Sequence, residues 1–201
     1  MRKFSLVFFS MILFAGCAAK KFVENENTFV HSRSPSIRIQ VDQDLKYLGE
    51  ANFQTTGKWG DWADTMFIQA FPFAQLDQEN RVIKVVVIDF VTTRSSGSYW
   101  ESAGTGPDEM LCDRAFKFSC GQLRDNELGT LMGQRGFKTD SSYAAALWNR
   151  ILNPNELMQI GYFEIIPAAI LWASPQEQQD FLQELKSRAA EAFTVVHFDL
   201  F

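Results

Sequence analysis

The sequence predicts an α+β fold, a single domain in which an antiparallel or mixed sheet packs against one or two amphipathic helices. Two observations predict the sheet: an apolar–polar alternation at residues 37–41 and an almost entirely apolar run at residues 82–91. Two further segments, 143–152 and 174–193, repeat apolar residues at helical spacing. The chain has 201 residues and is 46% hydrophobic, which is typical of one globular domain.

The folded domain is expected to begin near Ile37. Ile37, Ile39 and Val41 alternate with polar residues, as in a strand that buries one face. The segment 45–53 is expected to form a second strand after a polar turn. The residues before Ile37 are rich in charge, Asn and Ser, and they predict a tether in which His31 is solvated.

The best hairpin candidate joins residues 66–74 to residues 81–94 through the polar connector 76–80. Pro72 has no backbone N–H, so the first of these strands is expected at a sheet edge or with a bulge. Because the run 82–91 is apolar on both faces, it is expected to be a central strand that is covered on both sides.

The rest of the sheet is expected in shorter pieces. Residues 95–108 are rich in Ser and Gly and predict a loop, and a short strand is expected over 115–119. The apolar segment 161–172 is compatible with a strand or a buried helix. The chain is expected to end in a strand over 195–201.

Two helices are expected in the second half of the chain. The first covers 143–152 and ends at Asn153-Pro154. The second begins with a capping box, in which the Ser174 hydroxyl binds a free backbone amide and Glu177 reaches back. Pro175 suits the first turn of this helix because its missing N–H has no partner there.

The N-terminus is typical of an export signal. Arg2 and Lys3 form a positively charged start, and residues 4–16 are apolar and uncharged. A membrane-spanning helix needs about 20 residues, so this shorter run favours a signal peptide. Two small residues, Ala15 and Gly16, end the run.

The stretch Phe14-Ala15-Gly16-Cys17 resembles the lipobox of bacterial lipoproteins, although Leu is usual where Phe14 stands. The resemblance covers the leader only. It implies cleavage after Gly16, a diacylglycerol group on the sulfur of Cys17 and a further acyl chain on its new amine. The alternatives are an ordinary secretory signal that is cut near Ala18 or Ala19, and an uncleaved segment that is retained as an anchor.

The expected organisation is a signal peptide at 1–16, a lipidated N-terminus and tether at 17–36, and a globular domain at 37–201. Because Ala18 rather than Asp follows Cys17, the resemblance implies an outer-membrane protein that faces the periplasm. Removing the two cations of the leader changes the formal charge from −5 to −7. This acidic balance argues against a nucleic-acid partner, and the lipid replaces a basic patch as the means of membrane attachment.

The two remaining cysteines, Cys112 and Cys120, are expected to form a disulfide in an oxidising compartment. A disulfide needs Cα atoms about 4.4–6.8 Å apart, so residues 113–119 must then turn back on themselves. The alternation of Phe116 and Phe118 with polar residues favours extended structure and two buried thiols instead. The spacing is not Cys-x-x-Cys, and no metal or cofactor is predicted.

His197 and Asp199 are weak catalytic candidates. They lie two residues apart in the expected last strand, so their side chains share a face, as members of a catalytic triad would require. The sequence has no Gly-x-Ser-x-Gly motif to supply the nucleophile. Asp89, inside the apolar strand, is either a functional acid or a strand-end residue that binds nearby polar groups.

The segment 97–109 carries aromatic and acidic residues between glycines, but it matches neither a phosphate-binding loop nor a calcium loop. Trp59, Trp62 and Trp100 are candidates for a cluster that lines a sugar or small-ligand pocket. Packing in the core or in loops is the alternative for these rings.

The sequence therefore predicts a cell-envelope lipoprotein, anchored at Cys17, with a binding or scaffolding role rather than a catalytic one. Its expected partners are the membrane, through the lipid, and an envelope protein or a glycan. One alternative is an envelope hydrolase, which requires His197, Asp199 or the acidic residues of 97–109 to meet in one cleft. The other is a small-ligand or sugar-binding module, which requires a concave pocket.

Overall fold

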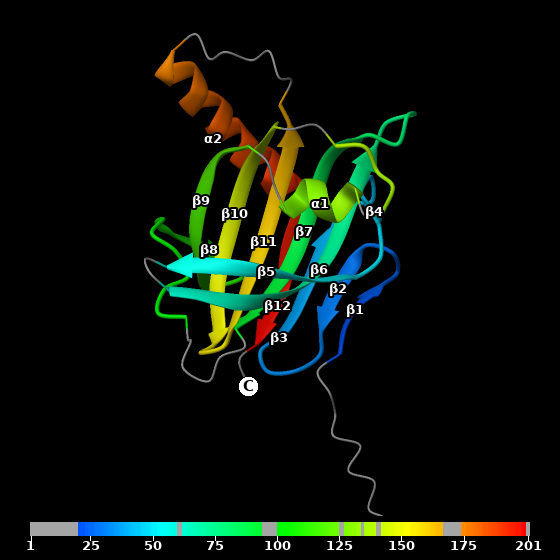
Figure 1. Ribbon diagram of the computed structural model, residues 1–201. Coiled ribbons are helices and arrows are strands. Elements are labelled where there is room, and N and C mark those ends of the chain that lie inside the picture. Colours follow the sequence, from blue (N-terminus) through cyan, green and yellow to red (C-terminus); the bar gives the residue numbers. More distant parts are fainter. Residues whose placement is uncertain are drawn as a thin grey trace, which may run out of the picture.

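The computed structural model describes residues 20–59, 62–93, 100–124, 127–133, 135–139, 142–166 and 174–199. Over these residues the chain is mostly β-structure, with antiparallel sheets of four and eight strands and two helices (Figure 1). This is a β-sandwich-like fold, so the predicted α+β class is wrong.

The small sheet has the order β1-β2-β3-β12, and all its pairs are antiparallel. Its strands are β1 (Lys21–Glu24), β2 (Thr28–His31), β3 (Ser36–Val41) and β12 (Phe193–Asp199). The alternation predicted at 37–41 is confirmed, because Ile37, Ile39 and Val41 are buried between exposed neighbours. The predicted last strand is confirmed as β12.

The tether predicted before Ile37 is wrong from Lys20 onward. The segment contains β1 and β2. The carbonyl of Lys20 already accepts from the backbone N–H of Ser32, and the Lys20 N–H donates to the Ser32 hydroxyl. Only some of its apolar residues join the core: Phe29 is fully buried and Val23 packs against the same core, whereas Phe22 is exposed. The polar composition of this segment led to the tether prediction, but a short strand needs only one apolar face to pack against a core.

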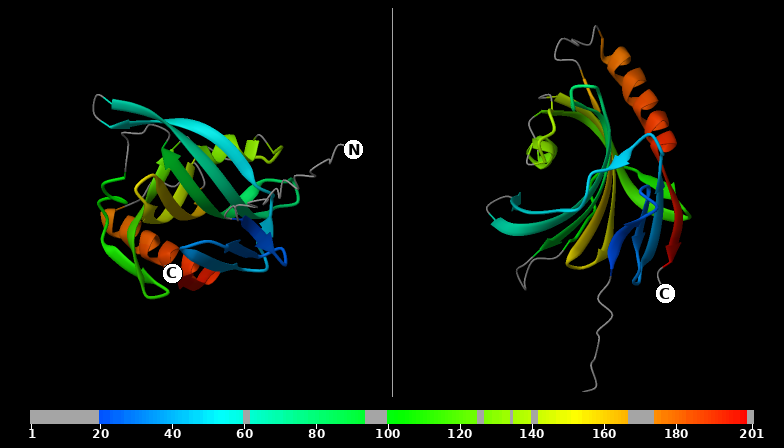
Figure 2. Two further views of the ribbon diagram at one scale, coloured as in Figure 1. Left: turned by 90° about the horizontal axis from the view of Figure 1, so that it is seen from below. Right: turned by 90° about the vertical axis from the view of Figure 1, so that its right-hand side faces the viewer.

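The large sheet has the order β4-β6-β7-β11-β10-β9-β8, with β5 paired to β6. It curves strongly, and Figure 2 shows the small sheet and helix α2 on its convex side and helix α1 on its concave side. Its strands are β4 (Lys46–Tyr47), β5 (Ala51–Trp59), β6 (Trp62–Leu76), β7 (Val82–Thr93), β8 (Asp108–Leu111), β9 (Arg114–Arg124), β10 (Ser142–Asn153) and β11 (Glu156–Ile165).

The predicted hairpin is confirmed as β6 and β7, and the apolar run is an inner strand of the sheet. Pro72 does not lie at the edge, but its partner strand is interrupted beside it. The carbonyl of Pro72 accepts a hydrogen bond from the backbone N–H of Leu48, which lies in the gap between β4 and β5. The proline nitrogen, which has no hydrogen to donate, faces the same gap, so no hydrogen bond between paired strands is lost. Gly49, at φ +88°, makes the turn within this gap.

Strand β7 contributes side chains to two separate hydrophobic cores, one on each face of the large sheet. Val86, Ile88 and Phe90 join the core on the convex side. Val85 and Val87 join a second core on the concave side. A strand that is buried on both faces therefore joins the two layers that cover the sheet.

The helix predicted at 143–152 is wrong, because these residues form β10. Ala144, Ala146 and Trp148 face the convex core, whereas Tyr143 and Ala145 face the concave core. With both faces apolar, the period of two disappears from the sequence and the alanines favour a helix. The Asn-Pro pair that was expected to end a helix forms the turn to β11 instead.

The second predicted helix is confirmed as α2 (Pro175–Ala192). The Ser174 side chain accepts from the Glu177 N–H at 3.2 Å, as the capping motif predicts. The short helix α1 (Glu127–Gly133) was not predicted. Among the described residues, no helix is both long enough and apolar enough to cross a membrane.

Candidate functional site

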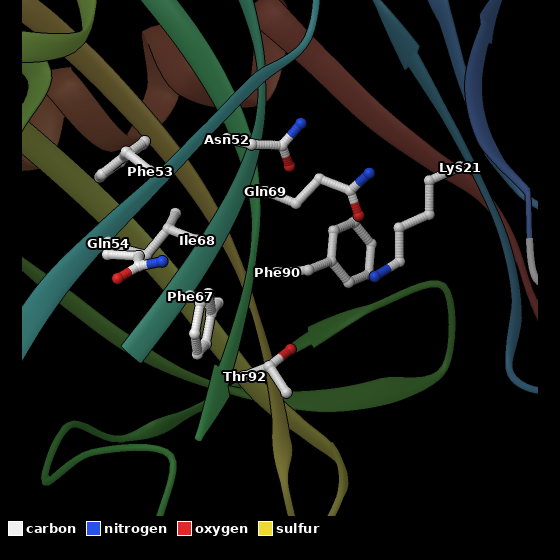
Figure 3. Close-up of a pocket in the computed structure, with 9 residues that line it drawn as sticks. All are labelled: Lys21, Asn52, Phe53, Gln54, Phe67, Ile68, Gln69, Phe90 and Thr92. Carbon is white, nitrogen blue, oxygen red and sulfur yellow. The ribbon is translucent and has the colours of Figure 1, made fainter. Parts of the chain in front are cut away.

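An open hollow of about 310 Å³ lies where β1 of the small sheet meets β5, β6 and β7 of the large sheet (Figure 3). Its lining combines side-chain amides, one hydroxyl, one ammonium group and apolar rings. The lining residues are Lys21, Asn52, Phe53, Gln54, Phe67, Ile68, Gln69, Phe90 and Thr92.

Strand pairing places most of these side chains on one face. Asn52 pairs with Gln69, which pairs in turn with Phe90 on β7. The next row on the same face consists of Gln54, Phe67 and Thr92. Since directly paired residues in an antiparallel sheet point to the same side, both rows face the small sheet.

Lys21 crosses the hollow from the small sheet, and Figure 3 shows its ammonium group beside the Phe90 ring. The Nζ atom lies 3.9 Å from the centre of that ring and 2.6 Å from Oε1 of Glu156. The two charged side chains are only 13% and 19% exposed. The cation is therefore already neutralised within the protein.

Glu50 holds two of the amides in place. Its Oε1 accepts from Nδ2 of Asn52 at 2.7 Å and from Nε2 of Gln69 at 2.9 Å. Because the NH₂ groups of both amides are directed to this carboxylate, their carbonyl oxygens remain as acceptors for a ligand. Such fixed orientation reduces the entropy that a ligand must overcome on binding.

His31 packs against Phe90, which lines the hollow. It is buried, its ring centre lies 5.5 Å from that of Phe90, and its Nδ1 donates to the carbonyl of Pro35 at 2.8 Å. Burial lowers the pKa of His31, and the nearby charge of Lys21 lowers it further, against the opposing effect of the Pro35 carbonyl. The expectation of a solvated His31 is therefore wrong.

Cys17, the predicted lipidation site, and Gly16, the predicted cleavage position, lie outside the described residues. The structure does place Cys112 and Cys120, and it leaves both thiols free and exposed. Cys112 lies in the two-residue turn between β8 and β9, at φ 48°, and Cys120 lies within β9 opposite Ala146. The predicted disulfide does not form, because extended strand separates the two residues by about 20 Å.

The candidate pair His197 and Asp199 lies in β12. Nε2 of His197 lies 2.9 Å from Oγ of Ser36, on an exposed face of the small sheet. Asp199 pairs with Ser36 in the strand register. The acidic residue Glu109 lies elsewhere, bound to Lys186 of α2 at 2.6 Å. Among the described residues, His197 and Glu109 therefore bind different partners in different places, whereas an envelope hydrolase would require such groups to meet in one cleft.

The predicted tryptophan cluster is only partly described. Trp59 pairs with Trp62 in the register of β5 and β6, but the side chains of both lie outside the described residues. Trp100 packs against the concave core, and its backbone N–H binds the carbonyl of Pro154. Residues 94–99 of the predicted loop also lie outside the described part.

Asp89 belongs to a row of polar residues that crosses the concave face, which the sequence did not indicate. In the strand register, Asp89 pairs with Gln159, Gln159 with Asn149, and Asn149 with Lys117. Gln159 donates to Asn149 at 2.7 Å, and Lys117 pairs with Asp108 at 3.0 Å. The row interrupts an otherwise apolar surface.

The residues of the hollow come from distant parts of the chain, and no motif joins them in the sequence. Among the described residues, no group of three His, Cys, Asp or Glu side chains is arranged to hold a metal ion. Comparison with protein-family models, with curated proteins and with solved structures finds no match. The chemistry of the hollow is therefore the basis for a functional proposal.

Proposed function

We propose that this protein is an exported lipoprotein, anchored through Cys17, whose folded domain binds a small, uncharged, hydroxyl-rich ligand such as a glycan unit. The observation that carries this proposal is the lining of the hollow. Asn52 and Gln69 supply amide carbonyl oxygens, which can accept from hydroxyl groups. Gln54 adds an amide that can donate and accept, and Thr92 adds a hydroxyl. Phe67, which is half-buried, supplies an apolar ring surface for the C–H face of a sugar.

The charges in the hollow favour a neutral ligand. Lys21 is the cation in the lining, and Glu156 and the Phe90 ring already neutralise it. An anionic ligand would have to displace the Glu156 carboxylate, which lies 2.6 Å from Lys21. The free energy needed to leave that partly buried carboxylate unpaired would exceed the free energy gained from the new ion pair. The volume of about 310 Å³ lies at the low end for small-molecule pockets, which favours a ligand of one or two rings.

The lipobox resemblance at Phe14-Ala15-Gly16-Cys17 supports the anchor. A lipid on Cys17 would keep the binding domain at the envelope membrane without a charged patch, in accord with the acidic balance of the chain. The absence of Asp after Cys17 supports an outer-membrane location that faces the periplasm. Together these features describe a binding module held where envelope glycans are found.

The anchor is tested by intact-mass measurement and membrane fractionation of the wild type and of Cys17→Ser. We expect the wild type to carry diacylglycerol and to fractionate with membranes, and the variant to be unacylated and released. A wild-type protein that is soluble and unacylated would contradict the anchor, and would leave the ligand proposal to be judged on its own test.

The ligand is tested by calorimetric titration of the mature chain, 17–201 with Cys17→Ser, against neutral mono- and disaccharides and envelope glycan fragments. We expect one class to bind, and Gln69→Ala to weaken it about tenfold by removing a hydrogen bond in the hollow. Gln75→Ala is the matched control, since it removes the same amide from the same strand outside the hollow. Equal losses in both variants, or no binding by any sugar, would contradict the proposal.

A further inference from the structure

Two arginines lie close together at one end of the convex face. Arg114 begins β9, and its Nε donates to the carbonyl of Phe198 at 3.5 Å. Arg150 lies in β10, with its guanidinium 5.2 Å from the Phe198 ring and 5.8 Å from the Phe116 ring. Both guanidinium groups thus contact the same short segment of β12.

Neither guanidinium forms an ion pair with a carboxylate among the described residues. Arg150 donates to the backbone carbonyl of Ala115, beyond the last paired residues of β9 and β10, and its Nε is buried without a partner. Burial, and then the positive charge of Arg114, lower the pKa of Arg150, so the two groups repel each other.

This end of the molecule is also where the chain arrives from Cys17. Lys21 binds Glu156 at the turn between β10 and β11, and Arg150 lies in β10 just before that turn. Figure 1 shows β1 beginning, and β12 ending, at this same end. Lys20 and Arg33, which are exposed here, also form no ion pair among the described residues.

The length of chain between Cys17 and the fold is very short. Lys20 is already bonded to Ser32, so only Ala18 and Ala19 separate Cys17 from the folded domain. Consecutive Cα atoms are about 3.8 Å apart, so Cys17 lies at most about 11 Å from Lys20. An acyl chain on Cys17 would therefore hold this end of the domain at the headgroup layer.

We propose that Arg114 and Arg150 bind the phosphate of an anionic phospholipid headgroup, in the membrane to which Cys17 attaches the chain. The inference rests on the proposed function only for the choice of that membrane. A guanidinium can donate two parallel hydrogen bonds to a phosphate. One phosphate bound between Arg114 and Arg150 would also neutralise their mutual repulsion, because neither guanidinium has a carboxylate partner among the described residues. Such a contact would fix the orientation of the domain and of its hollow above the bilayer.

The test is flotation of the mature chain, 17–201 with Cys17→Ser, on vesicles of phosphatidylcholine with and without about one third phosphatidylglycerol. The substitution removes the acyl anchor, so the result does not depend on whether Cys17 is lipidated. We expect binding only with phosphatidylglycerol, weakened about fivefold by Arg114→Gln and further by adding Arg150→Gln. Arg81→Gln, which removes the same charge elsewhere, should bind like the parent chain.

Two measurements keep the outcome clear. Thermal melting of each variant detects misfolding, and Arg114→Gln alone decides the question if the Arg150 variant unfolds. Equal weakening by Arg81→Gln, or absence of binding to phosphatidylglycerol, would overturn the proposal. Stabilisation of the parent chain by inorganic phosphate without vesicle binding, lost in Arg114→Gln, would assign the site to a soluble phosphate instead and overturn the lipid assignment.

Discussion

The two faces of the large sheet are built from the same strands but covered in different ways. The convex face is buried beneath the small sheet and α2, and its centre consists of closely packed rings such as Phe29, Phe71 and Phe90. The concave face is covered by α1 and the segment around Trp100, and it leaves Phe53 and Ile151 only half-buried. It also carries the polar row from Asp89 to Lys117.

This difference indicates which face stabilises the fold and which face tolerates change. A residue such as Phe71, which is fully buried between the large sheet and the small sheet, has no route to solvent, so a cavity left there stays empty. A residue under one short helix can relax as the helix shifts. We therefore expect mutations of similar chemistry to have unequal effects on the two faces.

The largest effect is expected for Phe71→Ala on the convex face. Phe71 is 1% exposed and its ring centre lies 4.8 Å from that of Phe29, so the truncation should lower the free energy of unfolding by about 3–5 kcal/mol. Leu131→Ala in α1, on the concave face, should cost about 2 kcal/mol. Urea denaturation of both variants measures the difference, and an equal or larger loss for Leu131→Ala would refute the comparison.

The same contrast explains what the sequence could and could not predict of the fold. Strand β3 was predictable because one of its faces is solvent-exposed, so Ile37 and Ile39 alternate with polar residues. Helix α2 was predictable because its cap at Ser174 is a local signal. Strand β10 was not predictable, since both its faces are apolar and the resulting pattern fits a helix equally well.

The residues of the candidate site were harder to predict from the sequence than the strands and helices. Lys21 and Glu156 form one ion pair, yet 135 positions separate them. Lys21 belongs to a segment whose polar composition predicted a tether, and the amides of Asn52 and Gln69 have no distinctive spacing. Only the pairing of β6 with β5 and β7 brings the amides and Phe90 together, and pairing partners are not encoded locally.

A medium effect is expected from the polar row on the concave face. Asn149→Leu should leave the amide of Gln159 without its 2.7 Å partner and cost about 1 kcal/mol. The double variant Asn149→Leu/Gln159→Leu removes both polar groups and should recover most of that loss. A double-mutant cycle by urea denaturation checks this, and strictly additive losses would show that the two amides do not depend on each other.

The smallest effect concerns His31, a polar residue on the convex side. Burial is the main reason that its pKa lies below the ordinary value of 6.5, so the unfolded chain binds a proton more readily than the folded chain. The stabilising contribution is complete above about pH 6.5 and is lost as pH falls from there toward the lower pKa of the folded state.

The His31→Gln variant should therefore lose less stability than the wild type between about pH 7.5 and pH 5.5. The control is His197→Gln, which removes the exposed histidine of β12 and should keep the wild-type dependence. Urea denaturation at both pH values measures the change. Parallel behaviour of His31→Gln and the wild type would mean that water reaches His31, and that the convex face is less completely closed than its packing indicates.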